Sequence, residues 1–225
     1  YRKWRREGKP KDAYEVLAWL ESHSDEQVAD EFYGPDWRKK YATAAEAVRN
    51  HRAEIKRMLK RIADAGIHPF WYFNYTDGYR PLVEQRWPDS ICRRADGEPI
   101  PSGWQMCHNM LGDPKVTSFG KFLDRSVVRI IHEYPELRGF FLDCFRHYEV
   151  DFAHDDGITV ADHLPAYSVN FSYDELTARM KKHFRKTGRP MSLFANKPQT
   201  IRSMRHVDAV LEEGDGDVHE GKYFW

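Results

Sequence analysis

The sequence predicts an α/β fold of the (β/α)8 TIM-barrel type, of which this chain holds only a part. Short apolar runs alternate with longer segments of helical periodicity, a pattern typical of parallel strands joined by right-handed crossovers. Several of the apolar runs stop on an acid or an amide. In parallel barrels the side chains at the carboxyl ends of the strands form the active site. A doubly wound open sheet is the alternative, but the glycine-rich phosphate loop that usually follows its first strand is missing.

The apolar runs give fewer strands than a closed barrel needs, which is eight. The four predicted strands cover residues 67–75, 139–143, 191–196 and 207–213. Further strands either fall within residues 23–42 or lie outside a chain that begins on Tyr1 and ends on an apolar run. We therefore expect residues 1–225 to form a single, partial barrel domain. Its localisation signal would then lie outside the sequence, and a secreted or periplasmic location fits this expectation.

Helices are predicted before and between these strands, at residues 11–22, 43–65, 119–133, 172–186 and 198–205. Thr43 with Glu46 forms a capping box, Ser118 is the expected cap of the third helix, and Ser172 with Glu175 forms a second box. The stretches 76–117 and 144–171 show no periodicity. Long loops of this kind inside a compact domain usually form lids or binding loops.

Composition excludes several classes of function. Lys plus Arg and Asp plus Glu are both 35, and this balance argues against a nucleic-acid binder, which would show a basic excess. No apolar run is long enough for a transmembrane helix, so no membrane partner is expected. Cys92, Cys107 and Cys144 lack metal-ligand spacing, although Cys92 and Cys107 could form one bridge. The 7 Trp, 12 Tyr and 13 Phe suit a cleft that packs on sugar rings, besides supplying the core.

Two strand-end carboxylates carry the expected chemistry. Asp143 ends the run Gly-Phe-Phe-Leu-Asp, and Glu213 ends a later run just before Gly214. Two carboxyl groups that face one cleft can cleave a glycosidic bond, one attacking or stabilising the anomeric carbon and the other protonating the leaving oxygen. Asp143 suits the first role and Glu213 the second. Glu212 points to the opposite face of the strand and is the alternative acid.

Other polar or aromatic side chains near the predicted strand ends are candidate substrate contacts. Trp71 could stack on a sugar ring, and Arg146 could keep the Asp143 carboxyl ionised. The remaining candidates could bind sugar hydroxyls; they are Asn74, Asp77, Asp156, Asn196 and Glu212.

Three short motifs resemble those of a known group of glycosidase barrels. Arg138-Gly-Phe-Phe-Leu-Asp143 resembles a strand of the barrels related to the α-galactosidases and the polygalactosaminidases. Ala195-Asn-Lys-Pro198 and Asp208-Ala-Val-Leu-Glu-Glu-Gly214 look like two later strands of the polygalactosaminidase-like barrels. The resemblance covers roughly residues 43–215. It implies that Asp143 and Glu213 are the catalytic pair and that Asn196 lines the cleft between them.

Two alternatives remain open. The segment after residue 143 is rich in acids and histidines, and a metal-dependent hydrolase could use His147, His154, Asp155 and Asp156. Its spacing matches no known metal motif, so no metal ligand is assigned and no organic cofactor is implied. The other alternative is a barrel that binds carbohydrate without cleaving it. Both the main reading and this alternative expect a carbohydrate partner, and neither fixes the sugar, the linkage or the oligomeric state.

Overall fold

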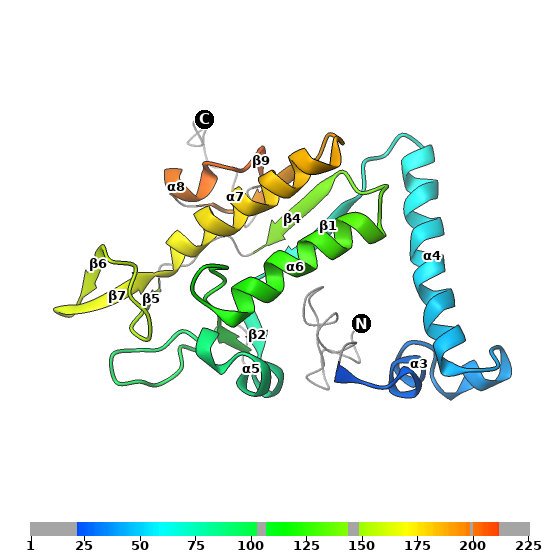
Figure 1. Cartoon of the computed structure of the whole chain (residues 1–225), viewed down its shortest axis with the longest axis horizontal. Helices are drawn as coiled ribbons and strands as arrows, with labels where there is room; N and C mark the ends of the chain where they lie inside the picture. Colours follow the sequence, from blue (N-terminus) through cyan, green and yellow to red (C-terminus); the bar gives the residue numbers. More distant parts are fainter. Residues whose placement is uncertain (1–21, 103–106, 144–148, 199, 212–225) are drawn as a thin grey trace, which may run out of the picture.

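A computed structural model describes residues 22–102, 107–143, 149–198 and 200–211 of the chain (Figure 1). Its centre is a parallel sheet with the strand order β1-β4-β8-β9. These strands are Phe70–Asn74, Gly139–Asp143, Ser192–Asn196 and Ala209–Leu211. Their order in space follows their order in the chain, and helices connect them. All four coincide with predicted strands, so the mixed α/β class with a parallel sheet is confirmed.

Helices precede β1 and lie between the successive strands of the central sheet in the sequence, mostly where periodicity predicts them. They are α3 (Asp25–Tyr33), α4 (Ala44–Asp64), α5 (Arg80–Arg86), α6 (Ser118–Glu133), α7 (Val169–Thr187) and α8 (Ile201–Met204), with short 3-10 turns η1 (Pro35–Lys39) and η2 (Pro88–Ser90). The start of α4 is as expected, since the Thr43 hydroxyl accepts a hydrogen bond from the Glu46 amide at 3.2 Å. No helix in the described residues is long and apolar enough to cross a bilayer.

Several local predictions are wrong. Residues 23–42 hold α3 and η1 rather than a strand, and the predicted helix at 11–22 lies outside the described residues apart from its last residue. Thr117, not Ser118, caps α6, because its hydroxyl accepts from the Gly120 amide. Ser172 lies inside α7, where its hydroxyl donates to the Val169 carbonyl. The helix α7 begins one turn earlier than the Ser172–Glu175 spacing predicts, with Ser168 at its N-cap.

The two stretches without periodicity have secondary structure of their own. The stretch after β1 contains α5 and the two-stranded ribbon β2 (Asp77–Tyr79) and β3 (Cys107–Asn109). The stretch after β4 contains the antiparallel sheet β5-β7-β6, made of Val150–Asp151, Leu164–Ser168 and Thr159–Ala161. Strands this short leave no periodic signal. Cys92 and Cys107 are both buried in this region, and no disulfide joins them.

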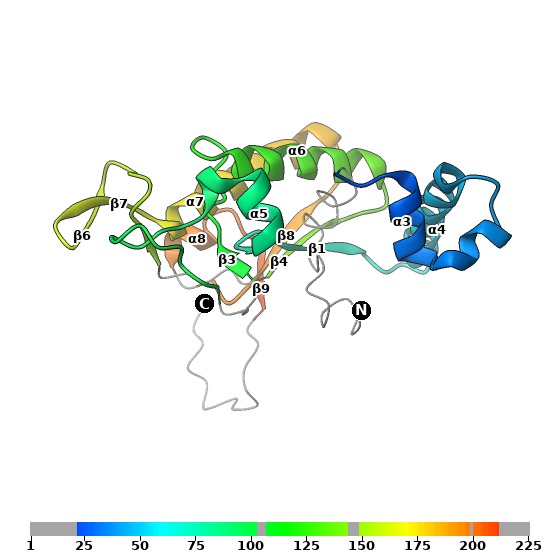
Figure 2. The same cartoon turned by 90° about the horizontal axis from the view of Figure 1, so that it is seen from below.

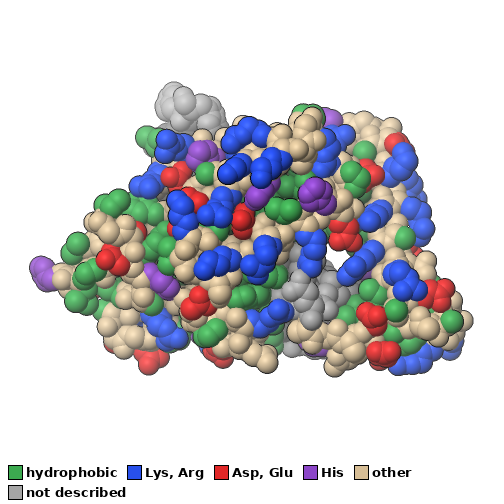
Figure 3. Space-filling view, viewed as in Figure 1, with side chains coloured by type: hydrophobic (Ala, Val, Ile, Leu, Met, Phe, Trp, Pro, Cys, Tyr) green, Lys and Arg blue, Asp and Glu red, His purple; other side chains and the backbone are tan. Residues whose placement is uncertain are grey.

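One face of the central sheet is covered by α6 and α7, which lie on the same side of it (Figure 2). The core between these layers is fully buried: Phe140, Leu142, Leu193 and Ala195 from the sheet meet Leu123, Val127 and Ile130 of α6 and Leu176, Met180 and Phe184 of α7. The outer surface of these helices carries many Lys and Arg side chains (Figure 3). We call the sheet side that meets α6 and α7 the helix face.

The opposite side of the sheet carries aromatic side chains that stay partly accessible. Successive strand residues point to opposite faces, so Phe70, Tyr72, Phe141 and Phe194 share this side. The rings of Phe70 and Phe194 lie 4.8 Å apart, and those of Tyr72 and Phe141 lie 5.9 Å apart. Gly139 allows the close strand approach here, since a Cβ at this position would lie 1.9 Å from the Ser192 carbonyl oxygen. We call this side the aromatic face.

Candidate functional site

Polar residues end three neighbouring strands and form a row at the carboxyl edge of the sheet. Asn74 is the register partner of Asp143, and Leu142 is the partner of Ala195, so Asn196 follows beside Asp143. By strand alternation, Asn74, Asp143 and Asn196 all belong to the aromatic face. In a parallel sheet this edge is where ligands and catalytic groups gather.

The Asp143 carboxylate is held by two side chains from the neighbouring strands. The Asn196 amide Nδ2 donates to Asp143 Oδ1 at 2.8 Å, and the Tyr72 hydroxyl donates to Asp143 Oδ2 in a short hydrogen bond. Each oxygen therefore has its own donor, and the carboxyl plane is fixed relative to the sheet. Hydrogen bonds to a charged group are stronger than those between neutral groups, which makes this orientation firm.

Tyr72 is a member of the site that the sequence analysis missed. It is 44% exposed and lies on the aromatic face, so its ring is accessible while its hydroxyl contacts Asp143. The predicted ring-stacking residue, Trp71, points the other way. Its ring lies 5.0 Å from that of Tyr134 and packs against the core on the helix face. The period of two along β1 could have distinguished them, because Trp71 shares a face with the buried Phe73.

Asn74, at the β1 end of the row, contacts Asp77 at the start of β2. The Asn74 amide donates to Asp77 Oδ2 at 3.0 Å, and its oxygen accepts from the Thr76 amide and hydroxyl at 3.1 and 3.0 Å. Both Asn74 and Asp77 are 2% exposed. Their hydrogen bonds to each other and to Thr76 fix the turn that leads from β1 into β2. They therefore form a wall of the site, next to Asp143.

Asn109 extends this wall and was also missed. It is the register partner of Asp77 in the β2–β3 ribbon, so both side chains share one face. The Asn109 side chain is 2% exposed, and its Oδ1 is buried without a hydrogen-bond partner in the described structure. A buried amide oxygen of this kind costs stability unless a ligand or water satisfies it. No periodic signal could have found Asn109, because β3 is three residues long.

Asp156 lies apart from this row, in the sheet that follows β4. One oxygen accepts from the Ile158 and Thr159 amides at 2.9 and 2.6 Å, and the other from the Ser168 amide at 2.9 Å and the Thr159 hydroxyl at 2.7 Å. Partial burial acts to raise the pKa of Asp156, but these hydrogen bonds outweigh it and lower the pKa. Both oxygens are thus used to close the β6–β7 hairpin.

The described members of the expected metal cluster do not converge. His154 Nδ1 is 2.5 Å from Asp151 Oδ2, whereas Asp155 accepts from the Gly157 amide and Asp156 closes its hairpin. Within the described ranges no group of three or more His, Cys, Asp or Glu side chains is placed to hold a metal ion. His147 lies outside the described residues, as do Arg146, Glu212 and Glu213.

No protein-family model matches the sequence. No curated protein matches it either. Among solved structures, the chain is similar to a maltogenic α-amylase from Thermotoga neapolitana, with a TM-score of 0.46 and 12% identity over 72% of this chain and 32% of that one. It is also similar to the glycoside hydrolase domain of PelA from Pseudomonas aeruginosa, with a TM-score of 0.44 and 14% identity over 70% and 55%.

A third similar structure is the α-N-acetylgalactosaminidase NagBb from Bifidobacterium bifidum, with a TM-score of 0.41 and 13% identity over 63% of this chain and 22% of that one. These neighbours are glycoside hydrolases. The chain spans between about a fifth and just over half of their lengths. At such identities and TM-scores, the function of this chain has to be derived from its own side chains.

Proposed function

We propose that this chain is part of a (β/α) barrel that hydrolyses an O-glycosidic bond, with Asp143 as nucleophile or charge stabiliser. The observation that carries the proposal is the carboxylate of Asp143, fixed by Tyr72 and Asn196 at the carboxyl edge of a parallel sheet. A carboxylate in this position can attack the anomeric carbon or stabilise its positive charge in the transition state.

The surroundings of Asp143 suit a sugar better than a flat aromatic or charged ligand. The aromatic face offers ring surfaces for the apolar side of a pyranose, while the strand ends offer amide and hydroxyl groups for its hydroxyls. Asn74 and Asp77 would keep the wall of the site rigid. Asn109 would support this wall from the buried side, since its side chain shares a face of the β2–β3 ribbon with Asp77.

The second carboxyl group is assigned from the sequence alone. Glu213 is the proposed general acid and base, with Glu212 as the alternative, and both follow the end of β9 directly. Arg146 is proposed to lie near Asp143 and to favour its charged form. A separation of about 5 Å between the two carboxyl groups would imply retention at the anomeric carbon, and about 6.5–9.5 Å inversion.

The proposal is tested by turnover of a panel of oligosaccharides and aryl glycosides by the wild-type protein and by Asp143→Asn. Asp64→Asn is the matched control, since that aspartate ends α4 on the surface, where its carboxylate pairs with Lys60. We expect turnover by the wild type and the control and none by Asp143→Asn. Turnover that survives in Asp143→Asn would place the reaction elsewhere, and binding without turnover in every protein would identify a carbohydrate-binding barrel.

A further inference from the structure

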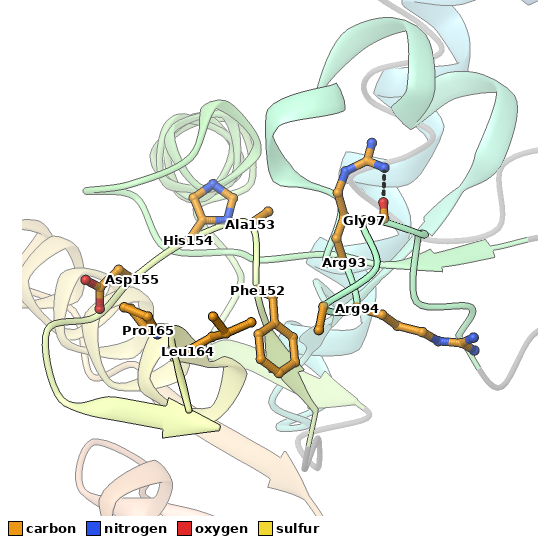
Figure 4. Close-up of a pocket in the computed structure, with 10 residues that line it drawn as sticks. Arg93, Arg94, Gly97, Phe152, Ala153, His154, Asp155, Leu164 and Pro165 are labelled. Carbon is orange, nitrogen blue, oxygen red and sulfur yellow. Dashed lines mark hydrogen bonds between the residues drawn. The ribbon is translucent and has the colours of Figure 1, made fainter. Parts of the chain in front are cut away.

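A groove lies between two segments that leave the same edge of the sheet as Asp143. One is the turn from Arg93 to Gly97 in the stretch after β1, and the other is the β5–β7 region after β4. The Phe152 amide donates to the Arg93 carbonyl at 2.9 Å, and the Arg93 amide donates to Asp151 Oδ1 at 2.8 Å. These bonds tie the two segments together and leave a cavity of about 440 Å³ between them (Figure 4).

The groove has an apolar floor and a polar rim. Phe152, Leu164 and Pro165 supply the floor, and Leu164 is 46% exposed. Arg93 and Asp155 stand on opposite sides of it in Figure 4. An apolar pocket with a few polar groups at its border is the usual form of a small-ligand site, and its volume lies in the normal range for one.

The walls of the groove are held in place by polar contacts, most of them to the buried Asp151. Arg93 Nη1 donates to the Gly97 carbonyl at 2.8 Å, which orients the guanidinium beside the groove. The fully buried Asp151 holds His154 on one oxygen and accepts from the Arg93 and Ala153 amides on the other. A wall fixed in this way loses little conformational entropy when a ligand binds.

We propose that this groove binds one sugar unit of a long neutral glycan, at a distance from the site of cleavage. Phe152 is the stacking surface, because it is half-buried and lies in the floor (Figure 4). Arg93 donates to hydroxyls of the ring, and Asp155 accepts from them. The inference rests on the proposed function and deepens it, since it makes a polysaccharide rather than a short oligosaccharide the preferred substrate.

Charge favours a neutral unit over an anionic one. Asp96 and Glu98 lie on the same turn as Arg93, and Asp155 lines the groove itself. The side chain of Arg94 points away from the other labelled residues in Figure 4. Arg93 donates to the Gly97 carbonyl and His154 pairs with Asp151, so among the described lining residues the cations do not converge on one point, as firm binding of a carboxylate or phosphate requires.

The test measures glycan binding separately from cleavage. Affinity electrophoresis with soluble starch, dextran, arabinogalactan, alginate and polygalacturonate is run with Asp143→Asn, so that the glycan stays intact. Phe152→Ala, Phe152→Trp and Ile158→Ala are then added in this background. Ile158 is the matched control, an exposed apolar side chain of the same region that does not line the groove. In parallel, turnover of aryl glycosides is measured with Asp143 intact.

We expect Phe152→Ala to weaken binding of a neutral polysaccharide about tenfold. Phe152→Trp should restore it, and Ile158→Ala should leave it unchanged. Turnover of aryl glycosides should be the same in all variants. Four results would each overturn the groove assignment. Two concern Phe152→Ala: unchanged binding of polysaccharide, or a loss of aryl glycoside turnover as large as its loss of polysaccharide binding. The other two are a preference of the protein for the acidic polymers and no binding of any polymer. The absence of aryl glycoside turnover alone would instead contradict the proposed hydrolysis, because binding is read out without it.

Discussion

The two faces of the central sheet use the same strands for different purposes. On the helix face, Phe140, Leu142, Leu193 and Ala195 are all fully buried against α6 and α7. On the aromatic face, Tyr72, Phe141 and Phe194 keep part of their surface accessible, and Tyr72 contacts Asp143. Residues on the helix face therefore stabilise the fold, and residues on the aromatic face are available for a ligand.

This difference explains how adjacent residues of one strand acquire unlike roles. Phe140 and Phe141 are the same amino acid in neighbouring positions, but only Phe140 lies in the core, 5.7 Å from Phe73 and 5.9 Å from Phe184. Phe141 instead packs on Tyr72. A hydropathy profile cannot separate them, because both faces of the strand read as apolar.

The largest effect on stability is expected from a substitution on the helix face. Phe140→Ala should lower the free energy of unfolding by about 3–5 kcal/mol, because it leaves a cavity in a packed core. Phe141→Ala should cost less, about 1–2 kcal/mol, since part of its surface is exposed in the folded protein. Chemical denaturation of the two variants measures the difference. Equal losses would show that the aromatic face is part of a closed core.

The next effect concerns the orientation of the proposed reactive carboxylate. Asn196→Ala removes the amide that donates to Asp143 at 2.8 Å. Such a bond is worth about 1.5–3 kcal/mol, so kcat/KM should fall about ten- to a hundredfold. Asn170→Ala, at a residue of α7, is the control variant. Steady-state kinetics on an aryl glycoside measures kcat/KM for both variants. Full activity in Asn196→Ala would mean that the reactivity of Asp143 does not depend on this hydrogen bond.

A smaller effect is expected from the wall of the site. Asn109→Ala removes a buried amide whose oxygen has no partner in the described residues. We expect KM to rise about fivefold, because the wall beside Asn74 and Asp77 loosens, while the midpoint of thermal unfolding falls only slightly, because the loss of an unsatisfied polar atom offsets part of the cost of the cavity. Kinetics and calorimetry on the same preparation test both statements. A lower midpoint with unchanged KM would make Asn109 a purely structural residue.

The smallest effect is a pH dependence away from the sheet. The hydrogen bond to Asp151 raises the pKa of His154 above its ordinary value of 6.5, against the opposing effect of burial, and Asp89 adds to it. Because the pKa of His154 is raised in the folded state, its contact with Asp151 stabilises the protein fully below pH 6.5. This contribution is lost as the pH rises through the raised pKa. Relative to His154→Gln, the wild type should therefore lose stability as the pH rises above 6.5.

Urea denaturation at several pH values measures this loss for both proteins. A constant difference between the wild type and His154→Gln over this rise in pH would show that the Asp151–His154 contact does not depend on protonation. The contact ties residue 154 to a buried aspartate that also anchors Arg93. The result therefore reports on the rigidity of the groove wall.

The sequence was sufficient to predict the layered core and the row of strand-end residues. Gly139–Asp143 and Ser192–Asn196 are bounded by clear helical segments, and their last residues are polar, so Asp143 and Asn196 could be recognised. Which face a side chain occupies was harder. The sequence suggests Trp71 as the ring-stacking residue, although the alternation with the buried Phe73 places Tyr72 on the accessible face.

Tertiary pairing created the parts that could not be predicted. Asn109 becomes part of the site only because β3 pairs with β2, and Asp156 becomes a hairpin residue only because β6 and β7 pair. Strands of two or three residues carry no period of their own. Their position depends on contacts between distant segments, such as the bond from the Arg93 amide to Asp151.

The central claim, that the aromatic face is a catalytic surface built around Asp143, is most directly tested by measuring the stability and turnover of Asp143→Asn together. A carboxylate kept for function rather than for the fold should be dispensable for folding. The account predicts an unfolding midpoint equal to or above that of the wild type and a loss of aryl glycoside turnover on the order of 10⁴-fold. A lower midpoint with turnover retained would contradict it, because Asp143 would then be a structural residue.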